Sequence, residues 1–172
     1  MDTATALQAR RDVRDFSSRP LSEEHLHVIL EACRAAPSSQ NWQPWNFVVV
    51  IEQSRREELA KVWRGAEHVV RAAAAVALVA PLPTDARQHD RVHYDLGQAT
   101  MCMMLAATDV GVASAHSGVA DSDLAREVLG HPVDHFCPYL ISFGYPPDGV
   151  TLAPVRRRAR RSYDDVVHLD HW

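Results

Sequence analysis

Lysine and cysteine are both scarce in this sequence. Lys61 is the only lysine, so nearly all of the basic residues are arginines. Arginine binds planar and tetrahedral anions through paired hydrogen bonds, so this bias is typical of an anion-binding protein, although a GC-rich genome produces it too. The three cysteines, Cys33, Cys102 and Cys137, are odd in number and far apart. They indicate free thiols in a reducing compartment rather than a disulfide framework.

Long apolar runs are also absent. No stretch approaches the roughly 18 apolar residues of a membrane span. Residues 1–12, "MDTATALQARRD", lack the apolar core of a signal peptide. We therefore expect a cytoplasmic protein with no membrane partner. The net charge of -4 gives no general attraction to nucleic acid.

The common nucleotide and metal motifs are missing as well. Neither G-x-G-x-x-G nor a Walker A sequence occurs, so neither a Rossmann site nor a P-loop is indicated. His131, His135 and Cys137 are residues of the metal-binding type. Prolines interrupt their segment and no fourth ligand follows, so we expect no metal site.

The chain does contain enough apolar sequence for one globular domain, residues 1–172, with 47% hydrophobic residues. Apolar periodicity predicts helices over 22–35, 54–65, 90–110 and 121–130, and strands over 46–51, 74–80 and 139–145. Ser22 and Asp121 are expected to cap two of these helices, and Gly65 and Gly111 to end two. The irregular order of helices and strands predicts an α+β fold with helices around a small mixed sheet.

The helix expected over residues 90–110 is apolar on almost every side in its inner part, "LGQATMCMMLAATDVG". A helix without a polar face lies inside a core or at a subunit interface rather than on the surface. The sequence favours neither of these two locations over the other.

The first of three polar clusters is "RRDVRDF", residues 10–16. Arg10, Arg11 and Arg14 lie within about one turn, so they would converge if the segment began a helix. Such a cluster either binds a phosphate or is neutralised by Asp12 and Asp15.

The second cluster is the loop that contains Ser38, Ser39, Asn41 and Gln43. Each amide side chain offers both a donor and an acceptor, and the serines add hydroxyl groups. The loop therefore suits a planar ligand edged with carbonyl and N–H groups. The alternative is a capped helix end followed by an ordinary polar turn.

The third cluster is "RRRARR", residues 156–161. In an extended segment Arg158 and Arg160 lie on one side, which again suits a phosphate. The alternatives are a solvated basic run and a nucleic-acid-binding segment.

Together these segments resemble the nitroreductase family of FMN-dependent oxidoreductases. "RRDVRDF" is similar to the family's opening RRSxRxF, and residues 21–50 to its helix, APS-x-x-N-x-QPW loop and strand. Residues 95–118 resemble its central helix, which begins with Asp, and the following glycine turn. "RRSYDDVVHLDHW", residues 160–172, resembles its C-terminal R-R-P-L-x-E-V-V-H…W. The resemblance implies a nitroreductase-like fold, with a small, mainly antiparallel sheet surrounded by helices, and a homodimer with FMN at the interface.

The resemblance also implies a set of flavin-binding residues. Arg10 would hold the phosphate, and Arg14 would lie near the N1/C2 edge of the ring, where a cation stabilises the charge of reduced flavin. His116 is a possible proton donor, as is water, and no residue is certain to be catalytic. The full set is Arg10, Arg11, Asp12 and Arg14, then Pro37, Ser38, Ser39, Asn41 and Gln43 from the other subunit, Ala115, His116, Ser117 and Gly118 from a turn near flavin N5, and Arg158 and Arg160, or Arg157 and Arg161 in a shifted alignment.

The implied reaction is ping-pong hydride transfer from NADPH or NADH, through the flavin, to an electron-poor acceptor of the nitroaromatic, quinone or enone type. Residues 62–92 are short for this family, and no flavin contact can be assigned there. Two alternatives stay open: a flavin-cleaving enzyme that makes dimethylbenzimidazole, and a flavin-binding protein without nicotinamide turnover.

Overall fold

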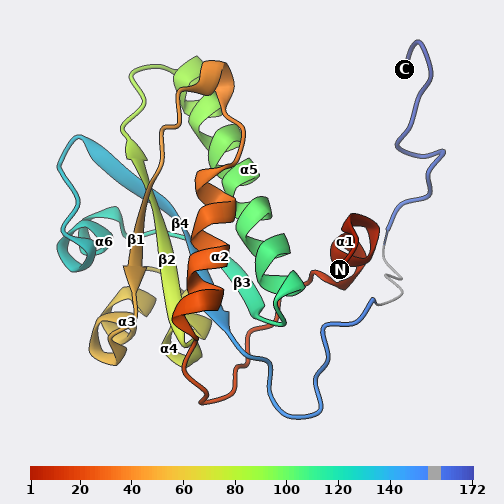
Figure 1. Cartoon of the computed structure of the whole chain (residues 1–172). Helices are drawn as coiled ribbons and strands as arrows, with labels where there is room; N and C mark the ends of the chain where they lie inside the picture. The colour runs from red at the N-terminus through yellow and green to blue at the C-terminus, as the bar shows by residue number, and fades with distance from the viewer. Residues whose placement is uncertain (155–159) are drawn as a thin grey trace.

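Helices cover both faces of one small sheet in this protein (Figure 1). The computed structural model describes residues 1–154 and 160–172. The sheet has four strands in the order β1-β2-β4-β3, and each neighbouring pair is antiparallel. Among the described residues the one parallel contact is an isolated bridge between Asp12 and Ser114. The expected α+β fold with a mainly antiparallel sheet is therefore confirmed.

The strands are β1 Asn46–Val50, β2 Ala74–Pro81, β3 Ala113–Gly118 and β4 His135–Gly144. β2 is buried from Ala74 to Ala80, because helices cover both faces of the sheet at its centre. A strand buried on both faces has an apolar sequence without alternation, which explains why "AAVALVA" could be recognised. The strands expected over 46–51 and 74–80 are confirmed, and β4 begins four residues before the expected strand at 139.

The two longest helices, α2 Glu23–Arg34 and α5 Ala86–Asp109, pack together on one face of the sheet. α1 Thr3–Ala9 lies beside α5. The buried side chains that join these helices to the sheet include Ile29, Cys33, Leu96, Met103, Ile141 and Phe143. Burial of each such side chain stabilises the fold by about 1.5–3 kcal/mol.

The opposite face carries three shorter helices, α3 Gln53–Ala60, α4 His68–Arg71 and α6 Ser122–Leu129. Leu59, Val69 and Ala125 from these helices pack against Ala77 and Leu140 of the sheet. Two single-turn 3₁₀ helices complete the fold, η1 Ser39–Asn41 and η2 Arg64–Ala66. Within the described ranges every helix is too short or too polar to cross a membrane.

The capping residues expected from the sequence act as caps. The Ser22 hydroxyl accepts a hydrogen bond from the His25 amide at 3.2 Å, and the Asp121 carboxylate accepts one from the Leu124 amide at 2.9 Å. Gly111 follows the end of α5 with a φ of +75°, a conformation that glycine adopts without strain. The helices expected over 22–35 and 121–130 are thus confirmed to within a residue at each end.

The expected helix over 54–65 is wrong in its second half. α3 ends at Ala60, and the Val62 carbonyl accepts the amides of Ala120 and Asp121 instead of continuing a helix. Gly65 does not end a helix; it lies in η2 against the Trp63 ring. α5 also begins earlier than expected, because Asp85 caps it through the Gln88 amide at 2.7 Å.

Gly144 allows Phe16 to lie directly against the end of β4, since a Cβ there would be 2.9 Å from the Phe16 ring and 3.1 Å from its Cβ. We predict that Gly144→Ala lowers the free energy of unfolding by about 1–3 kcal/mol, because the Phe16 segment must move. Denaturant titration measures this. Gly118→Ala is the matched control, because its nearest neighbour would be 3.9 Å away. Equal stability of the two variants would contradict the packing role of Gly144.

Candidate functional site

The segment after α1 is extended and runs along the outer edge of β3. α1 ends at Ala9, and the Val13 amide donates to the Ser114 carbonyl at 2.9 Å. Asp12 and Ser114 form the parallel bridge at this edge. The idea that the arginines of residues 10–16 converge on a helix start is therefore wrong, because pairing with β3 holds the segment extended.

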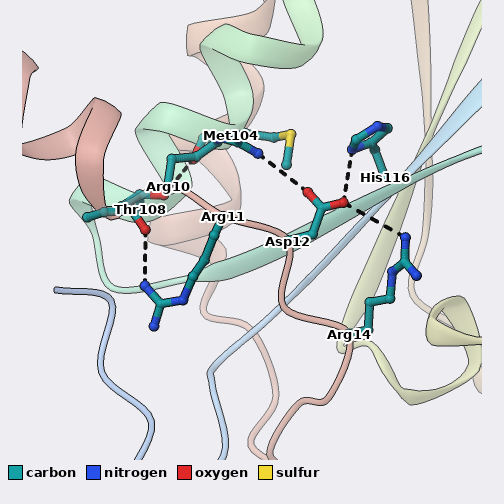
Figure 2. Close-up of polar contacts among 8 residues, drawn as sticks. Arg10, Arg11, Asp12, Arg14, Met104, Thr108 and His116 are labelled. Carbon is teal, nitrogen blue, oxygen red and sulfur yellow. Dashed lines mark hydrogen bonds and ion pairs between the residues drawn. The ribbon is translucent and has the colours of Figure 1, made fainter. Parts of the chain in front are cut away.

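Asp12 is the centre of the resulting polar cluster, which we call the Asp12 cluster: Arg10, Asp12, Arg14 and His116. Figure 2 shows the three basic side chains approaching the Asp12 carboxylate, at 3.4 Å from Arg10, 4.0 Å from Arg14 and 3.3 Å from His116 Nδ1. The Asp12 side chain is 28% exposed and that of Arg14 60%. Of the two guanidinium groups near this carboxylate, that of Arg14 is the more exposed to solvent.

Arg11 points away from this cluster. Its guanidinium donates to the carbonyls of Thr151 and Ala153, at 2.5 and 3.3 Å, and to the carbonyl of Ala9 at 3.2 Å. Arg11 therefore ties the start of the C-terminal segment to the N-terminal arm rather than joining Arg10 and Arg14.

The loop of residues 37–43 is attached to a buried carboxylate of α5. The Ser39 amide lies 3.1 Å from both oxygens of Asp95, and the Ser39 hydroxyl donates to the same carboxylate at 3.2 Å. Asp95 is fully buried, inside α5 rather than at its start. These bonds fix the loop and direct the Ser39 hydroxyl inward, toward α5.

The exposed part of this loop carries its amide side chains. Asn41 and Gln43 are exposed, and the Gln43 side-chain amide donates a hydrogen bond to Asn41 Oδ1 at 3.0 Å. The Ser38 hydroxyl accepts a hydrogen bond from the backbone amide of Gln43 at 2.9 Å. Gln40, Asn41 and Gln43 all have a positive φ, between 52° and 57°. Each such residue costs of order 1 kcal/mol, so the tie to Asp95 maintains a strained loop.

One chain does not bring this loop and the Asp12 cluster together. The loop is bonded to Asp95, whereas Figure 2 shows Met104 and Thr108, near the other end of α5, beside Arg10 and Arg11. The helical rise between Asp95 and Thr108 is roughly 20 Å.

Residues 115–118 form a strand and not the expected turn. They belong to β3, which pairs with β4 from Ala113↔Gly144 to Gly118↔Tyr139. Ala115 and Ser117 are buried, whereas the His116 side chain is 53% exposed. The Ser114 carbonyl points outward to Val13, so by strand alternation the N–H and C=O groups of His116 and Gly118 also point away from β4.

His68 of α4 is a site residue that the sequence did not identify. Its Nδ1 lies 2.7 Å from the Ser142 hydroxyl, and its buried Nε2 has no hydrogen-bond partner among the described residues. The pKa of His68 is lowered to about 4, mainly by burial and then by the positive charge of Arg14, against the opposite effect of Asp12. His68 therefore lies neutral within electrostatic reach of the Asp12 cluster. A lone histidine before a long apolar run was the one available signal.

The C-terminal arginines are only partly described. Arg158 lies outside the described residues, and Arg160 is exposed. Figure 1 shows residues 160–172 leading away from the sheet and its helices. Large apolar side chains in this segment are exposed, among them Tyr163, Leu169 and Trp172 at 72%, 79% and 97%.

Known proteins are similar to this chain both in sequence and in fold. A profile of the nitroreductase family matches residues 7–83. An Archaeoglobus fulgidus protein whose name assigns it to the NADH dehydrogenases and NAD(P)H nitroreductases is 31% identical over 170 residues, 96% of each chain. A Clostridium difficile protein named an FMN-dependent nitroreductase has a TM-score of 0.82 and 23% identity, covering 99% of this chain and 100% of that one. The NADPH:FMN oxidoreductase of Vibrio harveyi, solved with NAD⁺, has a TM-score of 0.85 and 22% identity, covering 97% and 76%.

The pKa of His68 makes stability depend on pH in a defined window. Because the folded-state pKa is about 4 and the ordinary value is 6.5, only the unfolded chain gains this proton as the pH falls from 6.5 to 4. We predict that the contribution of neutral His68 to the free energy of unfolding is fully present above pH 6.5. As the pH falls from 6.5 to 4, the free energy of unfolding should decrease by about 3 kcal/mol. Denaturant titrations at several pH values measure the free energy of unfolding.

The variant His68→Gln is expected to show a shallower loss of stability over the same pH window. His27→Gln, which removes an exposed histidine and keeps His68, serves as the control. If both variants follow the wild-type profile, His68 is not the group responsible.

Proposed function

Because the chain belongs to the nitroreductase family, we propose that it is an FMN-dependent oxidoreductase that passes reducing equivalents from NADPH or NADH to an electron-poor small molecule. The observation that carries this proposal is the Asp12 cluster, which gathers two arginines and His116 at the open edge of β3. When bound, the flavin would supply the hydride chemistry by a ping-pong sequence, with acceptors of the nitroaromatic, quinone or enone type.

The residues at this edge fit the two ends of FMN. Arg10 and Arg14 would bind the phosphate and the pyrimidine edge, because guanidinium groups donate charge-assisted hydrogen bonds to both kinds of acceptor. The outward N–H and C=O groups of His116 and Gly118 offer a donor and acceptor edge for a planar ring. Two hydroxyl groups of the same strand, those of Ser114 and Ser117, are buried without a partner among the described residues, as is Nε2 of His68.

We assign the loop of residues 37–43 to the flavin site of a second copy of the chain. Within one chain this loop is roughly 20 Å from the Asp12 cluster along α5. Tyr94 and Met101 of α5 are 68% and 40% exposed, and their spacing of seven residues places them on one face. Together with the exposed apolar side chains of residues 160–172, this face supports a homodimer in which each copy covers the other.

Proton delivery is assigned to His116 or to water. His116 is exposed at the strand edge, and Asp12 lies 3.3 Å from its Nδ1, which orients the ring. Arg14, beside the flavin ring, would stabilise negative charge that develops at the pyrimidine edge of the flavin. The free thiols of Cys33, Cys102 and Cys137 support a location in the reducing cytoplasm.

The visible absorption spectrum of the purified protein tests the function directly. We expect a flavin spectrum that bleaches when NADPH or NADH is added without oxygen and returns on addition of a quinone. A spectrum that persists with both donors would favour a flavin-binding protein or a dimethylbenzimidazole-forming enzyme, which product analysis in oxygen separates. A colourless protein that takes up no added FMN would overturn the proposal.

Mixed dimers test the shared site. Arg10→Ala should weaken FMN binding by about 1.5–3 kcal/mol, because a charge-assisted phosphate contact is lost. Asn41→Tyr should block the ring from the partner's side. A heterodimer of one Arg10→Ala chain and one Asn41→Tyr chain would then contain one doubly altered site and one intact site, so half of the FMN should return.

The control for this experiment is Arg34→Ala, since Arg34 pairs with Glu31 on the exposed side of α2. It should bind FMN as the wild type does. If the heterodimer recovers no FMN, the loop and the arginines act within one chain.

A further inference from the structure

A second group of arginines lines a pocket on the face of the sheet that carries α3 and α4. The pocket has a volume of about 530 Å³ and is bounded by residues 16–20, the start of α3 and residues 70–73. In Figure 1 these segments meet at the end of the sheet where α3 and α4 are labelled. Arg19, Arg56 and Arg71 belong to the pocket wall, and Arg10 and Arg14 do not.

Arg56 is a buried cation that contacts no carboxylate among the described residues. The residue is 7% exposed, and its terminal nitrogens donate to the Ile51 carbonyl and the Gln53 side-chain carbonyl. Both acceptors are neutral, and the buried Nε has no partner among the described residues. A buried charge without an opposite charge in contact is costly, so this position favours an anion nearby.

The carboxylates closest in sequence are engaged elsewhere. Glu57 accepts a hydrogen bond from Gln53 Nε2 at 2.9 Å and acts on Arg56 only at longer range. Glu52 pairs with Arg55 at 3.5 Å. Among the described residues no carboxylate lies within salt-bridge distance of Arg56.

The other two arginines add charge with little compensation. Arg71 pairs with Asp15 at 3.3 Å, and the Asp15 side chain, which does not line the pocket, is 77% exposed. The Arg19 guanidinium lies 4.0 Å from the centre of the Tyr145 ring, where it meets no carboxylate among the described residues. The buried hydroxyl of Ser17 is a further donor without a partner there. The pocket wall therefore contains three arginines and no carboxylate among the described residues, and Asp15 and Glu57 act on two of these arginines from outside the wall.

We propose that this pocket binds a phosphorylated small molecule, with the phosphate among Arg19, Arg56 and Arg71 and the organic part against the apolar wall. Guanidinium groups bind phosphate oxygens through paired, charge-assisted hydrogen bonds. Phe16, Pro20 and Val70 provide apolar surface in the same pocket. Its volume is in the range of small-molecule sites and leaves room for more than an inorganic ion.

Isothermal titration calorimetry with inorganic phosphate and with phenyl phosphate tests the proposal. The protein is loaded with FMN, so that the Asp12 cluster is filled, and chloride keeps the ionic strength constant. We expect saturable binding at one site per chain, with phenyl phosphate tighter because it also contacts the apolar wall. Arg71→Gln and Arg19→Gln should each weaken binding roughly tenfold or more.

Ser18→Asp is the sharper variant, because it places a carboxylate in the pocket without removing an arginine. It should abolish phosphate binding and raise the melting temperature. Arg34→Gln is the matched control and should bind phosphate as the wild type does. Arg56 itself is left intact, since it also holds the Ile51 carbonyl.

Three results would overturn the proposal: no binding of either probe by the wild type, unchanged binding by Ser18→Asp, or binding that Arg10→Ala removes and Arg71→Gln keeps. The last result would assign the phosphate to the Asp12 cluster. If the protein takes up no FMN, the same titration is made on the flavin-free chain with Arg10→Ala, which removes binding at the Asp12 cluster, so failure of the proposed oxidoreductase function is recognised separately.

Discussion

The hydrogen bond from the Val13 amide to the Ser114 carbonyl determines where the charged N-terminal arm lies. β3 is an edge strand, and this bond with the Asp12–Ser114 bridge occupies only one position along its outer side. The arm therefore delivers Arg10, Asp12 and Arg14 to the strand, while the outward backbone groups of His116 and Gly118 meet no backbone partner in residues 1–154 and 160–172. α1 holds only the first of these residues, because the Arg10 amide donates to the Ala6 carbonyl at 2.9 Å, so the pairing with β3 is what positions Asp12 and Arg14. Arg11 completes the arrangement by binding the carbonyls of Thr151 and Ala153.

α5 imposes the second constraint, because it separates the two polar groups that the proposed function needs. Asp95 holds the strained loop at the first half of α5, and the Asp12 cluster lies beside the C-terminal end of this helix. A rigid helix does not shorten, so no local adjustment brings both groups onto one ligand. A second copy of the chain would have to supply the missing group, and this copy would cover the two apolar side chains that α5 leaves exposed, Tyr94 and Met101.

The sequence predicted the fold well where local chemistry decides structure. Ser22, Asp121 and Gly111 set helix ends through bonds or φ values within their own turns. It failed where distant partners decide: Val62 leaves the helical path to accept bonds from Ala120 and Asp121. The order of residues 10–16 likewise gives no sign that β3 will hold them extended. His68 was missed for the same reason, since its partner Ser142 is 74 positions away.

The distribution of arginine pairs bears on what the arginine excess means. Arg34, Arg55 and Arg126 each meet a carboxylate three residues earlier on an exposed helix surface, where such pairs contribute little to stability. Arginines of this kind are what a compositional bias alone produces. Arg56 differs, because burial of an arginine without a carboxylate opposes folding unless something else uses its charge. Arg10 and Arg14 differ in another way, because they share Asp12 at an open strand edge. The arginine excess therefore has two parts in this chain: solvated surface pairs that a compositional bias alone produces, and two concentrations of arginine, at the Asp12 cluster and around Arg56, for which we propose anionic ligands.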